Sequence, residues 1–133
     1  MLVGDLVAFV ASRDLEVAGH FYGDVLGLRL VESSQFAKVY DVGGTMLRVT
    51  RVEEFAANPH TVLGWRVTDI AASIDALHNS GVSFTRYDGM AQDEDGVWSA
   101  PGGSCVAWFA DPDGNTLSLQ QAPPDGAGAH QRP

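Results

Sequence analysis

The sequence predicts an α+β fold made of two consecutive βαβββ modules, and two observations lead to this prediction. The same order of features occurs twice along the chain: an apolar strand-like run, an amphipathic helix, and strands that end in a hairpin. The spacing from the expected helix cap to the expected helix end also agrees, at 13 residues for 14–27 and 12 residues for 69–81. Self-similarity of this kind indicates a duplicated supersecondary unit. We therefore expect modules at about residues 5–52 and 61–121.

The first module opens with the apolar run 7–12, which predicts a strand. Asp14 follows it, and its short acidic side chain is a favoured helix N-cap. Apolar residues then recur at helical spacing until Gly27, which is placed to end the helix. The stretch 38–50, KVYDVGGTMLRVT, predicts a hairpin, because the Gly43-Gly44 pair can adopt the positive φ angles of a tight turn.

The second module repeats this order. The apolar run 62–68 predicts a strand, Asp69 is the expected cap, and Gly81 is the expected helix end. The stretch 107–119, AWFADPDGNTLSL, predicts a hairpin with its turn at Asp113-Gly114. The segment 91–103 between helix and hairpin is rich in turn residues, so we expect a long loop that presents Trp98.

Length and composition indicate one globular domain over residues 1–122, with a disordered tail at 123–133 that lacks any periodicity. The net charge of −9 disfavours nucleic acid and anionic lipid as partners. No apolar run approaches the ~20 residues of a membrane span, and no basic leader precedes the first apolar residues. The single cysteine, Cys105, agrees with a reducing compartment. We therefore expect a cytoplasmic protein.

Two motifs resemble a known family. FYGDVLGL after the first strand and WFADPDGNTLSL at the end of the second module are similar to the vicinal oxygen chelate superfamily, in its branch of glyoxalases, bleomycin-resistance-like proteins and dioxygenases. The resemblance covers about residues 5–121. It implies that the strands of both modules form a U-shaped mixed sheet around a cleft, with the helices outside. It also implies a homodimer.

Alternation along the strands sorts residues between the implied cleft and the helices. On this basis Leu47 and Val49, Leu63, Trp65 and Val67, and Leu117 and Leu119 are expected to face the helices. The expected ligand-binding residues are Val7, Phe9, Met46, Arg48, Val62, Gly64, Arg66, Trp98, Ser118 and Gln120. Tyr87 is a further candidate for stacking on a ligand, although capping the edge of the core is the favoured explanation for it.

The positions at which enzymes of this family bind a divalent metal are occupied here by Val7, Arg48, Val62 and Ser118. Two valines, an arginine and a serine do not supply the imidazole, carboxylate or thiolate donors that a transition metal prefers. We therefore expect no metal and no other cofactor. The alternative is a two-residue shift along the strands, which would bring Asp5, His60 and Gln120 to the ligand positions.

The sequence favours a protein that binds and sequesters a small aromatic or anionic compound. The expected cleft is mainly apolar with a few polar groups, which is typical of a small-molecule site, and it holds no His, Asp or Glu for acid–base catalysis. Arg48 needs a partner there, either a ligand anion or a protein acid such as Asp41 or Glu53. The alternative is a family enzyme, a lyase, isomerase or dioxygenase, that works without metal or with ligands elsewhere. No catalytic residue can be named.

Overall fold

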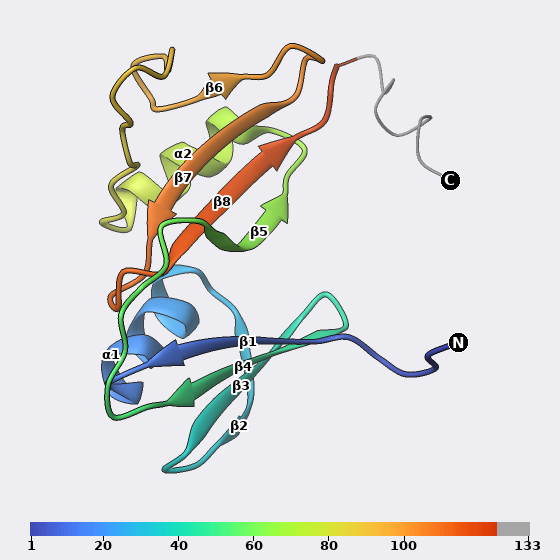
Figure 1. Cartoon of the computed structure of the whole chain (residues 1–133), viewed down its shortest axis with the longest axis vertical. Coiled ribbons are helices and arrows are strands. Elements are labelled where there is room, and N and C mark those ends of the chain that lie inside the picture. The colour runs from blue at the N-terminus through green and yellow to red at the C-terminus, as the bar shows by residue number, and fades with distance from the viewer. Residues whose placement is uncertain (125–133) are drawn as a thin grey trace. The chain divides into compact units, whose positions relative to one another are not determined.

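The computed structural model describes residues 1–124 and divides the chain into two compact units. The first comprises Met1–Ala57 together with Asp111–Asn115, and the second comprises the chain from Asn58 to Ala110 and from Thr116 onward. Each unit has one helical segment and its own four-stranded mixed sheet, which confirms the two predicted βαβββ modules (Figure 1). No helix within residues 1–124 is long and apolar enough to cross a membrane.

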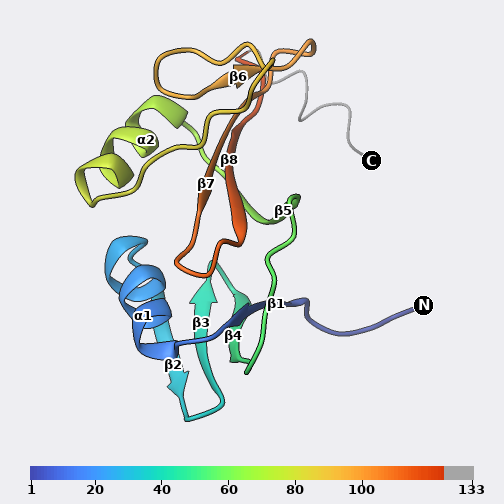
Figure 2. The ribbon, with the colours of Figure 1, turned by 60° about the vertical axis from the view of Figure 1, so that its left-hand side comes forward.

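The first unit contains β1 (Val7–Ser12), α1 (Leu15–Gly19), β2 (Arg29–Ser33), β3 (Ala37–Val42) and β4 (Thr45–Arg51). Its sheet has the order β1-β4-β3-β2, in which β1 runs parallel to β4 and the other neighbours are antiparallel. Helix α1 lies against one face of this sheet (Figure 2). The other face is free of helices within the unit.

Helix α1 begins where the sequence predicts. The Asp14 side chain accepts hydrogen bonds from the backbone N–H groups of Glu16 and Val17, as an N-cap should. The prediction of one continuous α-helix is wrong, because the segment His20–Val25 is a π-helical turn. The π-helical turn ends at Val25, and Gly27 follows two residues later with a φ of 74°, the left-handed conformation expected there.

The sequence of β4 alternates between the two faces of the sheet as predicted. Leu47 and Val49 are buried, and they pair in register with Tyr40 and Lys38 of β3, which contact the helical segment. Tyr22 lies in the same core and is fully buried. The helix side of the first sheet is therefore the hydrophobic core of the unit.

The DPDGN motif forms a polar network in this first unit. The buried carboxylate of Asp111 accepts hydrogen bonds from the Tyr22 hydroxyl at 2.6 Å and from the Asn115 side chain at 2.8 Å. It also accepts the backbone N–H groups of Asp113 and Asn115, both at 2.9 Å. Burial and the neighbouring Asp111 raise the pKa of Tyr22, so the hydroxyl keeps its proton and donates it. The motif is thus a structural turn, with all four contacts satisfied.

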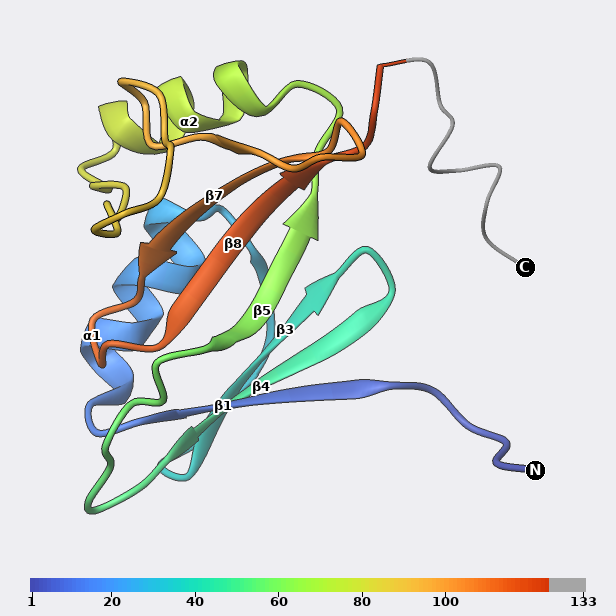
Figure 3. The ribbon, with the colours of Figure 1, turned by 45° about the horizontal axis from the view of Figure 1, so that its top comes forward.

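The second unit contains β5 (Thr61–Arg66), α2 (Ile70–Asn79), β6 (Trp98–Ser99), β7 (Cys105–Ala110) and β8 (Thr116–Gln121). The strand order is β5-β8-β7-β6, with β5 parallel to β8 (Figure 3). The prediction of an uninterrupted loop at 91–103 is wrong, because part of this segment is a strand. It contains the two-residue strand β6, because Trp98 and Ser99 pair with Val106 and Cys105.

Helix α2 packs against β8 and covers one face of the second sheet. Asp69 caps it by accepting the backbone N–H of Ala72, and Gly81, with a φ of 97°, follows its end. The buried side chains on this side are Ile70, Ile74, Val82, Ala107, Phe109, Leu117 and Leu119. Leu117 and Leu119 therefore face the helix as predicted. The greater part of the expected disordered tail, residues 125–133, lies outside the described residues.

Candidate functional site

Four of the predicted site residues lie together on the face of the first sheet that points away from α1. The parallel register of β1 with β4 places Val7 beside Met46 and Phe9 beside Arg48. Their neighbours toward the helix, such as Leu47, are buried, whereas the Phe9 side chain is 61% exposed. We call this helix-free face of the first sheet, with Val7, Phe9, Met46 and Arg48, the first open face.

Arg48 has neither of the protein partners considered from the sequence. Asp41 is paired with Arg29 at 2.6 Å, and Glu53 with Arg51 at 3.3 Å. The backbone N–H of Gly44 and the guanidinium of Arg29 lower the pKa of Asp41, so its carboxylate stays ionised and bonded to these two groups. Within residues 1–124, the guanidinium of Arg48 forms no ion pair or hydrogen bond.

A second polar group on the same strand also lacks a partner. The hydroxyl oxygen of Thr50 is buried and has no hydrogen-bond partner within the described part of the chain. Thr50 lies two residues beyond Arg48 and so on the same face of β4, between the small residues Ala11 and Ala37. Buried polar atoms without a partner are uncommon in native proteins and frequently mark functional positions.

The second sheet has its own open face, opposite α2. The register places Gly64 beside Ser118 and Arg66 beside Gln120, as the sequence predicts. Val62 differs, because the pairing of β5 with β8 shifts between Thr61 and Leu63. A β-bulge of this kind takes the extra residue out of the ladder, so simple alternation no longer assigns Val62 to either face.

An aromatic cluster stands on this second open face. It consists of Tyr87, Trp98 and Trp108, and the Trp108 ring centroid lies 5.5 Å from that of Tyr87 and 6.3 Å from that of Trp98. Trp108 pairs in register with Ser118, which places the two on the same face. Beside Trp108 the sheet carries only small residues, Ser118 and Gly64, so the indole rises above its neighbours.

Sequence reasoning missed Trp108. The strand CVAWFA is apolar at nearly every position, so alternation does not show which set faces the helix. The available signal was the hairpin itself. Pairing β7 with β8 in antiparallel register brings Phe109 opposite the helix-facing Leu117, and Trp108 therefore points the other way.

Gln92 fixes the segment that carries Tyr87. The side-chain oxygen of Gln92 accepts the backbone N–H of Tyr87 at 2.8 Å, and its side-chain nitrogen donates to the carbonyl oxygens of Thr85 and Gly96. Arg86 adds hydrogen bonds from its guanidinium to the carbonyls of Gln92 and Asp93. These contacts hold the ring of Tyr87 against Trp108, and Trp98 is held by its pairing in β6.

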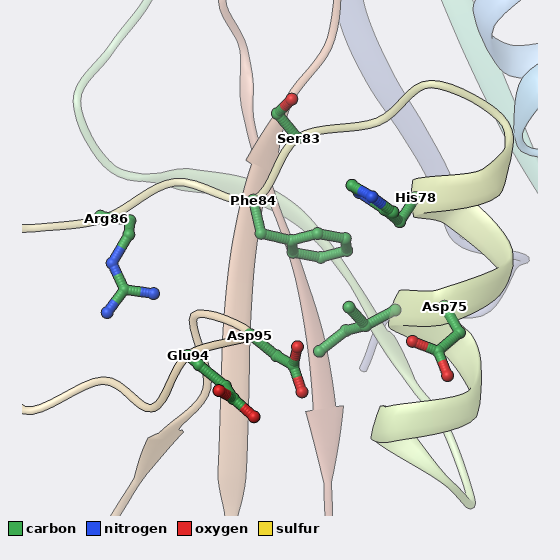
Figure 4. A pocket seen from close by; sticks show the side chains of 8 residues that line it. Asp75, His78, Ser83, Phe84, Arg86, Glu94 and Asp95 are labelled. Atoms are coloured by element: carbon green, nitrogen blue, oxygen red, sulfur yellow. The ribbon is translucent and has the colours of Figure 1, made fainter.

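Two hollows lie elsewhere in the second unit. A cavity of about 240 Å³ lies between α2 and the segment 83–95, where the ring of Phe84 points toward the helix and Asp75 and His78 line the helix side (Figure 4). None of the predicted site residues lines it. A more open hollow of about 510 Å³ is lined by Arg66 and residues at the start of α2.

The side chains at the expected metal positions do not fit a divalent cation. Val7 has no donor atom, Arg48 carries the same sign of charge as the metal, and Ser118 is a weak neutral donor. Among the described residues, no group of three or more His, Cys, Asp or Glu side chains is placed to hold a metal ion. The alternative donors Asp5 and His60 precede β1 and β5, outside the paired residues.

Comparisons with known proteins agree with this architecture. The chain matches the model of the Glyoxalase/Bleomycin resistance protein/Dioxygenase superfamily over residues 5–119. Among curated proteins, none matches the chain.

Several solved structures are similar in fold. Lactoylglutathione lyase from Agrobacterium tumefaciens is 20% identical with a TM-score of 0.66, covering 89% of this chain and 92% of its own. The fosfomycin resistance protein FosX from Listeria monocytogenes is 12% identical with a TM-score of 0.71, covering 94% of this chain and 98% of its own. A glyoxalase/bleomycin resistance protein/dioxygenase from Nocardioides is 14% identical with a TM-score of 0.71, covering 95% and 87%. At these identities the likeness shows the fold alone. Because the family model spans most of the sequence and the two βαβββ modules are present, the chain belongs to the glyoxalase/bleomycin resistance protein/dioxygenase superfamily.

Proposed function

We propose that the protein binds a small planar organic molecule without using a metal ion. The observation that carries the proposal is the aromatic cluster of Tyr87, Trp98 and Trp108 on the second open face. Aromatic rings grouped beside small residues offer a flat apolar surface to a planar ligand, and they lose little conformational entropy when they bind it. The single cysteine, Cys105, suits the cytoplasm that we propose as its location.

The neighbours in fold support a small ligand as the class of partner. The names of two of them refer to small molecules, lactoylglutathione and fosfomycin. Binding is favoured over catalysis because the predicted ligand-binding residues include no His, Asp or Glu, and Asp41, which lies opposite Met46, is already paired with Arg29. The single cleft that the resemblance implies stays a prediction.

Truncating Trp108 to alanine is expected to weaken binding of an uncharged planar probe, 2-naphthol, by about tenfold, since one aromatic contact contributes roughly 0.5–1.5 kcal/mol. Isothermal titration calorimetry with excess chelator present measures this. Trp65→Ala is the matched control, because Trp65 pairs with the helix-facing Leu119 and so lies on the other side of the sheet. Equal losses in both folded variants, or no binding to the unaltered protein, would refute the proposal.

Metal addition provides a second test of the same proposal. Nickel, zinc, iron or manganese should leave the melting temperature unchanged. A ligand raises the melting temperature only if the folded state binds it, and the proposed site binds no metal. A stoichiometric metal that raises the melting temperature would instead support the alternative from the sequence, an enzyme of this superfamily whose ligands lie outside the usual positions. Asp5 and His60 would then be the first residues to replace.

A homodimer is part of this proposal. Met1, Leu2, Val3 and Leu6 are strongly exposed apolar residues that precede the edge strand β1. Exposed apolar groups of this kind are typical of contacts between chains. Sedimentation velocity should show a dimer of the unaltered protein. When Leu2, Val3 and Leu6 are all changed to serine, the dimer should already dissociate at higher protein concentrations. A monomer at every concentration would argue against it.

A further inference from the structure

We propose that Arg48 binds a carboxylate of the ligand, so that a fixed guanidinium charge stands where enzymes of this superfamily place a metal ion. This inference names a chemical class of ligand for the small-molecule binding proposed above, and it rests on that function. It is carried by residues of the first unit, whereas the aromatic cluster belongs to the second. The two can therefore be tested separately.

The position of Arg48 makes an absent partner costly. Its side chain is partly buried and projects from β4 between Phe9 of β1 and Val39 of β3, which are both apolar. A guanidinium in apolar surroundings loses hydration without compensation unless an anion is supplied. A carboxylate suits it, since the planar fork of N–H groups can donate to both oxygens at once.

The protein's own acids do not supply this anion. The two carboxylates considered for it, Asp41 and Glu53, are held by Arg29 and Arg51. No other acid within residues 1–124 pairs with Arg48. Arg13, Arg29 and Arg51 each pair with a carboxylate, and Arg48 does not.

The surroundings of Arg48 indicate a monoanion with an apolar body. The ring of Phe9, 61% exposed, and the side chains of Val7 and Met46 form an apolar surface next to the guanidinium. Arg29 also lies on this face, but it is already paired with Asp41, and the chain carries a net charge of −9, which disfavours a phosphate dianion. The Thr50 hydroxyl, two residues further along β4 and without a partner, offers one more donor.

Titration with benzoate and with its uncharged analogue benzamide tests the proposal by isothermal titration calorimetry. The unaltered protein should bind benzoate at least tenfold more tightly than benzamide. Arg48→Gln should abolish this preference, because it removes the charge and the fork. Arg48→Lys, which keeps the charge and loses the fork, should retain part of it. Arg51→Gln is the matched control, since it removes the same charge from a neighbouring residue of β4 that is already paired with Glu53.

The outcomes separate this inference from the proposed function. Equal affinity for benzoate and benzamide, or a preference that survives in Arg48→Gln, would overturn the role of Arg48 even if 2-naphthol binds. An Arg48-dependent preference for benzoate in a protein that does not bind 2-naphthol would sustain the role of Arg48 and remove that of the aromatic cluster. Circular dichroism spectra of all variants check that they are folded. If Arg48→Gln does not fold, the comparison of Arg48→Lys with the unaltered protein still tests the proposal.

Discussion

Changing Asp111 to alanine is expected to destabilise the protein by about 3–5 kcal/mol, the range found when one partner of a buried charged group is removed. Asp111 is only 6% exposed, and its carboxylate accepts four hydrogen bonds, from Tyr22, from Asp113 and twice from Asn115. Alanine would leave these donors buried with no acceptor. Each such group costs roughly 1–3 kcal/mol. The melting temperature in a thermal scan should fall by about 9–25 °C, at roughly 3–5 °C per kcal/mol.

Two control variants make this result specific. Tyr22→Phe removes a single hydrogen bond to Asp111 and should cost only about 1–2 kcal/mol. Asp113 lies in the same turn, and its side chain, 8% exposed, accepts hydrogen bonds from the backbone and guanidinium of Arg13; an asparagine oxygen can still accept them, so Asp113→Asn should cost only about 1 kcal/mol. An Asp111→Ala protein no less stable than Tyr22→Phe would show that the carboxylate is not the centre of the network.

The Asp113 control also has a defined pH dependence. Burial by itself would raise the pKa of Asp113, but the Arg13 backbone N–H, the Ser12 hydroxyl and the Arg13 guanidinium lower it below its ordinary value of 3.8. A pKa lowered in the folded state adds stability above the unfolded pKa, and this stability is lost as the pH falls through the folded value. The small difference between Asp113→Asn and the unaltered protein should therefore disappear once the pH falls below the lowered pKa of Asp113.

Replacing Phe109 with alanine is expected to cost about 3–5 kcal/mol by removing the largest buried ring of the second unit. Phe109 is 1% exposed, and its ring centroid lies 5.4 Å from that of Phe84. Truncation loses both the transfer free energy of the ring and the packing of the walls around it, because a dense core collapses only partly. Urea denaturation followed by circular dichroism measures the change in unfolding free energy.

Phe36→Ala is the matched control for this prediction. It removes the same atoms from a side chain that is 66% exposed, so the unfolding free energy should change by no more than about 0.5 kcal/mol. Phe109→Ala should exceed it several-fold. Comparable effects of the two variants would mean that the packing of Phe109 contributes little, and that the second unit is held together chiefly by its strand pairing.

The facing of several candidate residues could be predicted from sequence, because β4 and β8 alternate between helix-facing apolar residues and residues of the other face. Val7, Phe9, Met46 and Arg48 share a face as expected, and so do Gly64 and Ser118. The rest depended on contacts between strands distant in sequence. The bulge in β5 left Val62 unassigned.

The partners of the charged residues also depended on such contacts. Asp41 pairs with Arg29 because β2 and β3 are in register there, which leaves Arg48 without that acid. A sequence contains no distances between side chains, so it does not show which of several arginines a given carboxylate pairs with. Only the three-dimensional register decides which arginine a given carboxylate meets.

By itself, the sequence determined the duplicated modules, the helix caps Asp14 and Asp69 and the hairpin turns, since these follow from local spacing and backbone preference. The tertiary structure alone decided the π-helical turn and the facing of Trp108. An apolar strand suits either face equally well in isolation. The orientation of β7 is set when Phe109 is buried opposite Leu117 of β8. This contact forms only in the folded sheet, so the sequence of β7 alone does not determine the orientation.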